Sequence, residues 1–508
     1  MPQQKRNRWM GVAAALGAGA LLSLSPAVVR AQNATLDDLL EKLKDKGVLS
    51  DDEYQSLKKA REEEQLEERD AHRRQAVKEA EQADAQAKAK EAEAKATKYD
   101  VNPGIKSLQL FGDVRLRYEA RNATSTVPIA GISPATDAEG LDRWRYAVRV
   151  GIRGDLVDDW YYGLRLETGN NPRSTWATFG GNTTIQSANG GAGPSAKGGS
   201  AAIQLGQAYL GWRTTPWLSV QAGKMPNPLY TTPMVWDPDI APEGIAERVN
   251  YKWGDHVELY ANFMQMIYEE QAPDQTGNNV DLGFHKQDAW LYAWQLGGAY
   301  KFNQGTNVKA GLTYYQYQNR TNLNGFTGDG PPATTAAYFL SQNGINNLQI
   351  LELPAEFNFP LFGFNARIFG DIAKNLDGGA RAKAAGHNGV NEDSAYQIGV
   401  GYGNLGLVYG TVAKKGTWEV RTYWQRVEQF ALDPNLTDSD FFEGRTNLQG
   451  VYLAGAYSFT DAIIGTLRWG YAQRINKQLG TGGSNPDLPG VNPVDDYRLL
   501  QVDLTWKF

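Results

Sequence analysis

The sequence has 508 residues and no cysteine, so it forms no disulfide and offers neither a thiol nucleophile nor a thiolate metal ligand. It has only four histidines, and none of them accompanies a Gly-x-Ser-x-Gly nucleophile motif. No glycine-rich phosphate loop joins a strand to a helix, and the net charge of −6 disfavours nucleic-acid binding. These absences predict no enzyme, no catalytic residue, no metal, no cofactor and no nucleic-acid partner.

Long apolar runs are also missing, because no segment beyond the N-terminus approaches the ~18 apolar residues that a spanning helix needs. The N-terminus itself has a basic start, an apolar run over 9–24 and small residues ending at Ala31. This order is typical of a secretory signal peptide. We therefore predict a cleaved signal over 1–31 and an exported mature chain. The alternative, a membrane anchor, is disfavoured because the run is short.

Residues 32–98 differ in composition from everything after them. A short apolar helix is predicted up to Gly47, and a second helix begins with a capping box formed by Ser50 and Glu53. A charged, alanine-rich run with a faint heptad follows. The pattern predicts a periplasmic helical or coiled-coil segment, and a trimeric stalk and a solvated single helix both remain open.

From Ile105 onward the apolar period changes from helical to the alternation of β-strands. The predicted fold class is an all-β transmembrane protein: a 16-stranded antiparallel up-and-down barrel over 99–508. Glycine (55), tyrosine (25) and tryptophan (14) are abundant, as expected for turns and aromatic girdles. The predicted strands are 105–120, 142–155, 158–169, 202–213, 217–225, 244–253, 256–268, 288–302, 306–319, 347–359, 362–374, 394–403, 416–430, 447–459, 462–475 and 496–508.

Short and long connections alternate between these strands, except for a medium one at 404–415. Outer-membrane barrels have this asymmetry, with short periplasmic turns and long extracellular loops. Aromatic residues flank the short turns and predict a girdle at one membrane interface. The last strand alternates strictly, and Leu504, Trp506 and Phe508 share its apolar face. A terminal aromatic in this position resembles the signal read by the outer-membrane assembly machinery.

The polar faces of the first three strands carry seven arginines. Their neighbours are apolar, and an arginine facing lipid would cost about 2–4 kcal/mol at the midplane, so the arginines are predicted to face an aqueous lumen. Pairing with the lumenal carboxylates Asp113, Glu119 and Glu167 is the alternative to an open basic wall. The predicted pore-lining basic wall is Arg115, Arg117, Arg143, Arg145, Arg149, Arg153 and Arg165.

The loop after the fifth predicted strand contains five prolines between positions 226 and 242, together with Trp236, Asp237 and Asp239, and Glu243 follows it. A stiff acidic loop folded inward would narrow the pore and oppose the arginines. We predict that these four residues form a constriction, and an ordinary extracellular loop is the alternative. Calcium binding by Asp237-x-Asp239 or by Asp438-Ser439-Asp440 is also conceivable, although such motifs are more often simple turns.

Several segments resemble the putative porin family of proteobacteria, which is related to the phosphate-selective porins. The segments are GKMPNP…VWDPDIAPEG (223–244), KKGTWEVRTYWQRVEQFAL…DSDFFEGRTNLQG (414–450) and GDVRLRYEARN…DRWRYAVRVGIRG (112–154). The resemblance implies a passive, trimeric outer-membrane channel. The phosphate-selective relatives carry lysine-rich pore loops, and this sequence has none that is recognisable.

The predicted function is an outer-membrane porin of a Gram-negative bacterium, a passive channel for small hydrophilic solutes or ions with a weak anion preference. The predicted partners are outer-membrane lipid, those solutes or anions, the assembly machinery and two further copies in a homotrimer. The alternative function is a surface-binding or adhesin barrel with a plugged lumen. The transported solute does not follow from the sequence.

Overall fold

The computed structural model describes residues 39–48, 50–60, 63, 102–126, 138–169, 174–179, 203–269, 288–318, 345–410, 414–481, 487–488, 491 and 493–508. The chain divides into two compact units, Met1–Val101 and Asn102–Phe508. The predicted signal peptide and the predicted heptad run lie outside the described residues. Among the described residues, no helix is long and apolar enough to span a membrane.

The first unit contains helical segments at 39–45 and 51–60. Gly47 ends the first segment with a φ of +64°. The predicted capping box is present: the Ser50 amide donates to Glu53 Oε2 at 3.0 Å, and the Glu53 amide donates to Ser50 Oγ at 3.4 Å. An ion pair of 2.9 Å between Lys44 and Asp51 joins the two segments.

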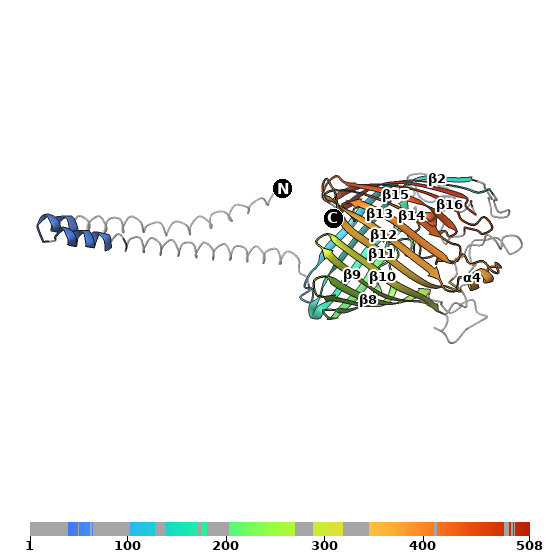
Figure 1. Ribbon diagram of the computed structural model, residues 1–508, viewed down its shortest axis with the longest axis horizontal. Coiled ribbons are helices and arrows are strands. Elements are labelled where there is room, and N and C mark those ends of the chain that lie inside the picture. The colour runs from blue at the N-terminus through green and yellow to red at the C-terminus, as the bar shows by residue number, and fades with distance from the viewer. Residues whose placement is uncertain are drawn as a thin grey trace, which may run out of the picture. The chain divides into compact units, whose positions relative to one another are not determined.

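The second unit is a closed antiparallel barrel (Figure 1). Each long strand pairs with its neighbours along the chain, and β1 pairs with β17 to close the wall. Over the described residues the barrel has sixteen long strands, as predicted. They are β1 (Gln109–Thr124), β2 (Ala138–Asp155), β3 (Trp160–Thr168), β5 (Ile203–Thr215), β6 (Leu218–Lys224), β7 (Glu243–Trp253), β8 (Val257–Glu269), β9 (Ala289–Asn303), β10 (Thr306–Gln318), β11 (Gln349–Leu361), β12 (Phe364–Asn375), β13 (Ser394–Gly403), β14 (Trp418–Val427), β15 (Leu448–Ser458), β16 (Ile463–Arg474) and β17 (Asp496–Lys507).

Several strand bounds differ from the prediction by up to four residues, and one short strand is new. The first strand begins four residues later than expected, because Ile105 forms only an isolated bridge to Leu156 before the regular ladder starts. A two-residue strand, β4 (Ala177–Thr178), was not predicted. It pairs with β2 beyond the point where β3 ends, so a piece of the following loop extends the wall there.

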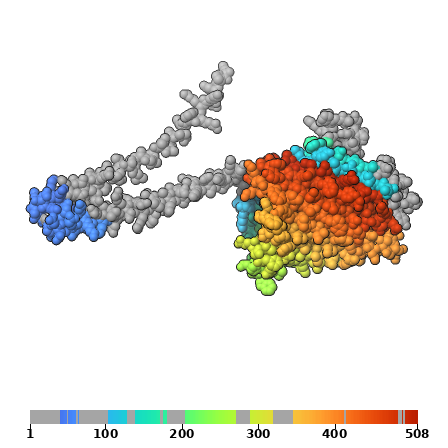
Figure 2. Space-filling view, turned by 45° about the horizontal axis from the view of Figure 1, so that its top comes forward, coloured from blue at the N-terminus to red at the C-terminus, as the bar shows by residue number. Residues whose placement is uncertain are grey.

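The outer face of the barrel is apolar, and its register is the predicted one. Leu116, Leu453 and Leu504 are each more than 40% exposed, while the residues beside them on the opposite face are more buried. In Figure 2 the residues of the later strands, orange to red, form one continuous outer surface. The aromatics beside the short turns are exposed as well, and Trp160 stacks on Trp212 with ring centroids 5.7 Å apart. This is the girdle that the short-turn pattern predicted.

The interior is not uniformly aqueous. The inward faces of β8 to β11 carry large apolar side chains, among them Met264, Leu291 and Ile350, and these pack against residues from inward-folded loops in one buried cluster. The expectation of a wide aqueous lumen therefore holds for only part of the barrel cross-section. Loop insertion fills the remainder with a hydrophobic core.

Candidate pore and its lining

A cavity of about 1180 Å³ lies inside the barrel. Inward-facing residues of β1, β2, β12 and β14 to β17 form most of its wall. The connecting segments 174–179, 225–242, 404–410 and 428–447, together with Asp487, also contribute lining residues. Basic and acidic side chains line the cavity in nearly equal numbers.

The strand register puts all seven predicted arginines on the inward face of β1, β2 and β3. Five of them line the cavity: Arg115, Arg117, Arg143, Arg145 and Arg149. Arg153 and Arg165 lie on the same face but outside the cavity lining. Arg153 donates to Gln109 at 2.9 Å, with its guanidinium 4.9 Å from the Phe111 ring centroid.

Most of these arginines form ion pairs, so the wall is a charge network rather than a set of free cations. The three carboxylates considered as partners in the sequence all take part. The pairs are Arg115 and Arg149 with Asp113 (2.8 and 2.7 Å), Arg143 and Arg145 with Glu119 (2.6 and 3.5 Å), Arg117 with Asp503 (2.7 Å), and Arg165 with Glu167 (2.8 Å).

Glu119 is the centre of this network. Its side chain is fully buried, and besides Arg143 and Arg145 it lies 3.0 Å from Arg121 and 3.7 Å from Arg117. Arg121 was not among the predicted residues because the strand was expected to end one residue earlier. The alternation that placed Arg115 and Arg117 would have found it in a longer strand.

The segment 428–447 folds inward and brings an acid to the arginines. Asp440 lies 3.0 Å from Arg117 and 3.3 Å from Arg121, and Gln501 also donates to it at 3.0 Å. Burial opposes ionisation of Asp440, but the two guanidinium groups outweigh that effect and hold its pKa below the usual aspartate value. Sequence analysis gave Asp438-Ser439-Asp440 only as a possible calcium turn and did not predict Asp440 as a partner of the arginines. Among the described residues, no group of three or more acidic or histidine side chains is arranged to hold a metal ion.

The loop 225–242 crosses the interior from its own strands to the opposite wall. The Tyr230 amide donates to Gln295 Oε1 on β9 at 2.9 Å. The next two residues continue the attachment, since the Thr231 hydroxyl donates to Glu352 on β11 and the Thr232 hydroxyl donates to Asp371 on β12, both at 2.5 Å. The inward-folded course that the prolines suggested is therefore present.

The predicted constriction residues take different positions. Trp236 is buried, and its indole N–H donates to the Ile240 carbonyl at 3.0 Å. Asp237 lines the cavity but accepts hydrogen bonds from the Ser439 amide and hydroxyl. Asp239 also lines it, 3.8 Å from Arg149. Glu243 instead begins β7 on the outer face, where it pairs with Lys224 at 2.9 Å.

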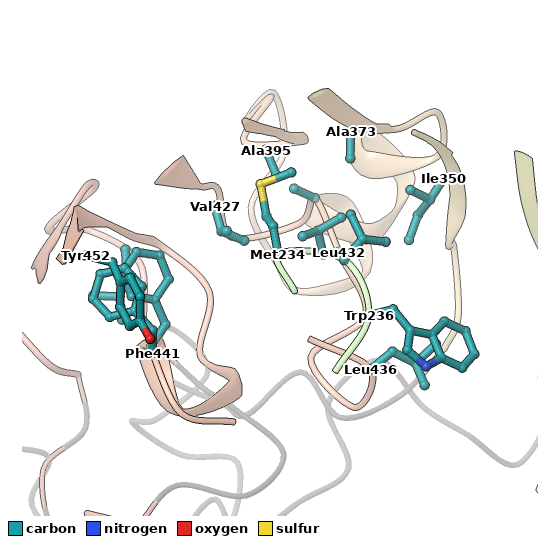
Figure 3. Close-up of a cluster of buried hydrophobic side chains, with 14 of the residues drawn as sticks. Met234, Trp236, Ile350, Ala373, Ala395, Val427, Leu432, Leu436, Phe441 and Tyr452 are labelled. Carbon is teal, nitrogen blue, oxygen red and sulfur yellow. The ribbon is translucent and has the colours of Figure 1, made fainter. Parts of the chain in front are cut away.

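The loop 225–242 and the segment 428–447 pack against each other. Figure 3 shows Trp236 beside Leu436, and Met234 near Leu432 and Ala395. Backbone bonds reinforce the contact, since the Asp237 amide donates to the Leu436 carbonyl at 2.6 Å. Burial and the nearby Asp440 raise the pKa of Asp438 to about 7. Burial also raises the pKa of Asp239, despite the neighbouring Arg149.

The medium connection after β13 also turns into the barrel. Leu407 and Val408 are buried, and the Val408 amide donates to Glu419 Oε2 at 2.8 Å while its carbonyl accepts from Arg468 at 3.2 Å. The next residue, Tyr409, brings its ring 4.8 Å from the guanidinium of Arg421 on β14. Sequence analysis marked this connection only as an exception to the short-and-long pattern.

A closed antiparallel barrel with an apolar outer band, an aromatic girdle and a charged interior cavity defines a transmembrane β-barrel channel. The putative porin family model matches residues 74–335 and 341–508. The chain belongs to the putative porin family, as the sequence segments had suggested, and is an outer-membrane porin. No curated protein shows significant sequence similarity to it.

Solved porin structures also resemble the chain. OprB of Pseudomonas putida, in its high-pH structure, is 12% identical over 79% of this chain and 94% of its own, with a TM-score of 0.43. A mutant of Rh. blastica porin is 12% identical over 79% of this chain and 100% of its own, with a TM-score of 0.35. At these TM-scores, neither likeness adds to what the strand pairing and the family already establish.

Proposed function

We propose that the protein is a passive diffusion channel for small hydrophilic solutes or ions with a weak preference for anions. The observation that supports this most directly is the charge balance of the cavity. Arg421 and Lys507 both line it, and neither forms an ion pair among the described residues. Cations without a bound counter-charge raise the local concentration of anions.

The acids of the cavity contribute less negative charge than their number suggests. Asp113, Asp440 and Asp503 each lie within ion-pair distance of arginines. Burial raises the pKa of Asp438 to about 7, so this carboxyl is only partly ionised near neutral pH. The remaining positive charge is small, which is why the expected preference is weak.

Planar-bilayer recording of the refolded protein tests this proposal. We expect single-channel conductance in KCl and, under a salt gradient, a reversal potential on the anion-selective side. A cation-selective reversal potential would contradict the anion preference. A correctly folded barrel without any conductance would favour the alternative, a surface-binding barrel with a plugged lumen.

We further propose that copies of the chain associate, as a trimer, through the wall formed by β3 and β5 to β8. The two shortest barrel strands lie here, β6 with seven residues and β3 with nine. A strand needs about 9–11 residues to cross the bilayer core. β6 is shorter than this and β3 only just reaches it, so the hydrophobic height of the barrel is smallest at this part of the wall.

Polar groups on the outer face of the same wall support this assignment. Glu247 on β7 faces outward across from Val220 and Phe263. Gln265 donates to its Oε1 at 3.4 Å, while its Oε2 is buried without a hydrogen-bond partner among the described residues. A carboxylate facing lipid is costly, and a neighbouring subunit could supply the missing donor.

The oligomeric state of matched variants in mild detergent tests the interface. Val220→Trp on β6 should convert trimers to monomers, because the larger side chain would separate two tightly packed walls. Val400→Trp, at an exposed outward position on β13, should leave the trimer intact. Equal behaviour of the two variants would refute this choice of wall.

We also propose that 1–31 is a cleaved export signal, that 32–98 is a separable periplasmic segment and that Leu504, Trp506 and Phe508 form the assembly signal. The backbone of Phe508 exchanges two hydrogen bonds with Gly112 across the closing seam. Phe508→Ala keeps those bonds and removes the ring, so it should lower outer-membrane yield without changing conductance. Unchanged yield would contradict the signal, and a barrel that cannot fold without 32–98 would contradict separability.

A further inference from the structure

Arg421 is the most unusual charged side chain of the cavity. It is only 7% exposed, yet it lines the cavity, and it makes no hydrogen bond or ion pair with any part of the chain that the structure describes. Its Nε is buried without a partner. An unpaired buried guanidinium is costly to retain, so its position suggests that a partner arrives from the cavity.

Two aromatic rings lie close to this guanidinium. Its central carbon lies 3.9 Å from the ring centroid of Phe369 on β12 and 4.8 Å from that of Tyr409 in the inward-folded segment. Rings against the faces of a guanidinium leave its edge N–H groups as the donors for a ligand. Two parallel donors on one edge match the geometry of a carboxylate.

The open side of Arg421 is the cavity that it lines. Its neighbours across the strands are the small residues Gly401 on β13 and Ala454 on β15. The Leu405 side chain covers Gly401, with Cδ2 3.2 Å from the place where a Cβ would stand. Gly399 has a related role, because a Cβ there would come within 2.5 Å of both Phe369 and Tyr423. The glycines of β13 therefore allow the aromatic rings to occupy this part of the wall.

The other charged and aromatic groups nearby favour an organic anion. Tyr423 and Tyr452 also line the cavity and stack with centroids 4.7 Å apart. Glu419, two residues before Arg421 on the same face, opposes an anion, although one of its oxygens accepts the Val408 amide. Arg468 forms an ion pair with Asp503, whereas Lys507 is a second cation of the cavity wall without an ion pair among the described residues.

We propose that Arg421, Phe369 and Tyr409 form an interior binding site for aromatic carboxylates, with the carboxylate on the edge of Arg421 and the ring against the aromatic wall. The inference rests on the proposed channel function and adds a solute class to it. Inorganic phosphate fits less well, since one guanidinium among aromatic rings offers few polar donors for its remaining oxygens.

Benzoate is the probe, with acetate, benzyl alcohol and inorganic phosphate as comparisons. Calorimetric titration into the detergent-solubilised protein measures binding without reference to transport, and current block in planar bilayers measures it in the open pore. Benzoate should bind more tightly than acetate, because only benzoate engages the rings. Benzyl alcohol and phosphate should each bind more weakly than benzoate.

Substitutions on β14 test whether Arg421 binds the carboxylate. Arg421→Gln should weaken benzoate binding about tenfold or more, as expected for the loss of one charge-assisted bidentate pair. Arg421→Lys keeps the charge but loses the two parallel donors of the guanidinium. Its affinity for benzoate should therefore lie between those of the unmodified protein and Arg421→Gln. Arg426→Gln is the matched control, because Arg426 lies on the outer side of the same strand, paired with Glu428 at 3.1 Å. It should bind benzoate like the unmodified protein.

The outcomes separate the two proposals. A protein that conducts with anion preference but binds benzoate no better than acetate, or whose Arg421→Gln variant folds and binds benzoate unchanged, overturns this site and leaves the channel proposal standing. Tighter binding of phosphate than of benzoate would replace the carboxylate assignment. Benzoate binding that depends on Arg421 in a barrel without conductance would support the site and overturn the channel.

Discussion

The arginine-rich sector of β1 to β3 and the sector around Arg421 on β14 both present guanidinium groups to the same interior, but in opposite electrostatic states. In the first sector, Glu119 alone lies within ion-pair distance of four arginines. In the second, Arg421 has aromatic neighbours and no carboxylate partner among the described residues. The number of lumenal charges is therefore a poor guide to selectivity, because pairing decides which of them act on a solute.

The largest effect is expected in the paired sector. Glu119→Gln should lower the free energy of unfolding by about 3–5 kcal/mol, because it leaves buried arginines without their shared counter-charge. Denaturant unfolding in detergent, followed by tryptophan fluorescence, measures this. Glu356→Gln is the control, since its 3.6 Å pair with Arg367 is more exposed, and its cost should be below about 1 kcal/mol. Similar midpoints for both variants would break the comparison.

The comparison also depends on which face of each strand points inward. Leu504→Arg places a charge on the outer face and should impair insertion into bilayers by up to about 2–4 kcal/mol, and by less if the site lies near the interface. Thr505→Arg adds the same charge to the cavity lining and should insert normally. Folding yield into lipid vesicles, scored by heat-resistant mobility on gels, distinguishes them. Equal tolerance would contradict the register.

Selectivity should respond to the paired arginines only through the acids they neutralise. The triple variant Arg143, Arg145, Arg149→Gln leaves Glu119, Asp113 and Asp239 with fewer counter-charges, so its reversal potential should move toward the cation-selective side. Arg421→Gln should move the reversal potential less, because only one charge is removed, and it should not lower the unfolding midpoint, because no ion pair is lost and a buried unpaired charge is removed. If the triple variant kept the native reversal potential, the arginine sector would have no part in selectivity.

The smallest effect is a pH dependence from Asp438. Its pKa of about 7 lies well above the ~3.9 of an unfolded aspartate. The folded protein thus holds this proton more tightly, and stability falls as pH rises from about 4 to about 7. Ionisation adds a negative charge to the cavity, so anion preference should weaken as the pH rises through about 7. Asp438→Asn should remove this change, and a variant that keeps the full pH dependence would assign it to another group.

The sequence could predict those features of the site that depend on residues close together in the chain, and it could not predict those that depend on contacts between distant segments. Arg117 and Arg149 could be placed because a strand has a period of two and lipid excludes charge, which fixes the inward face locally. Arg421 obeys the same alternation, but its lack of a partner depends on what the neighbouring strands and the 404–410 segment place beside it. Asp440 was missed as a partner of Arg117 because the two residues are far apart in the chain.

The sequence by itself determined the barrel: the number of strands, their register, the girdle and the family all follow from short-range alternation and from the spacing of turns. Those features are local because the membrane acts on every strand in the same way. Only the tertiary structure decided which loops enter the barrel, that part of its interior is a hydrophobic core, and which cations remain unpaired. These features depend on contacts between segments such as 225–242 and 428–447, and no local pattern encodes where two loops meet inside a closed wall.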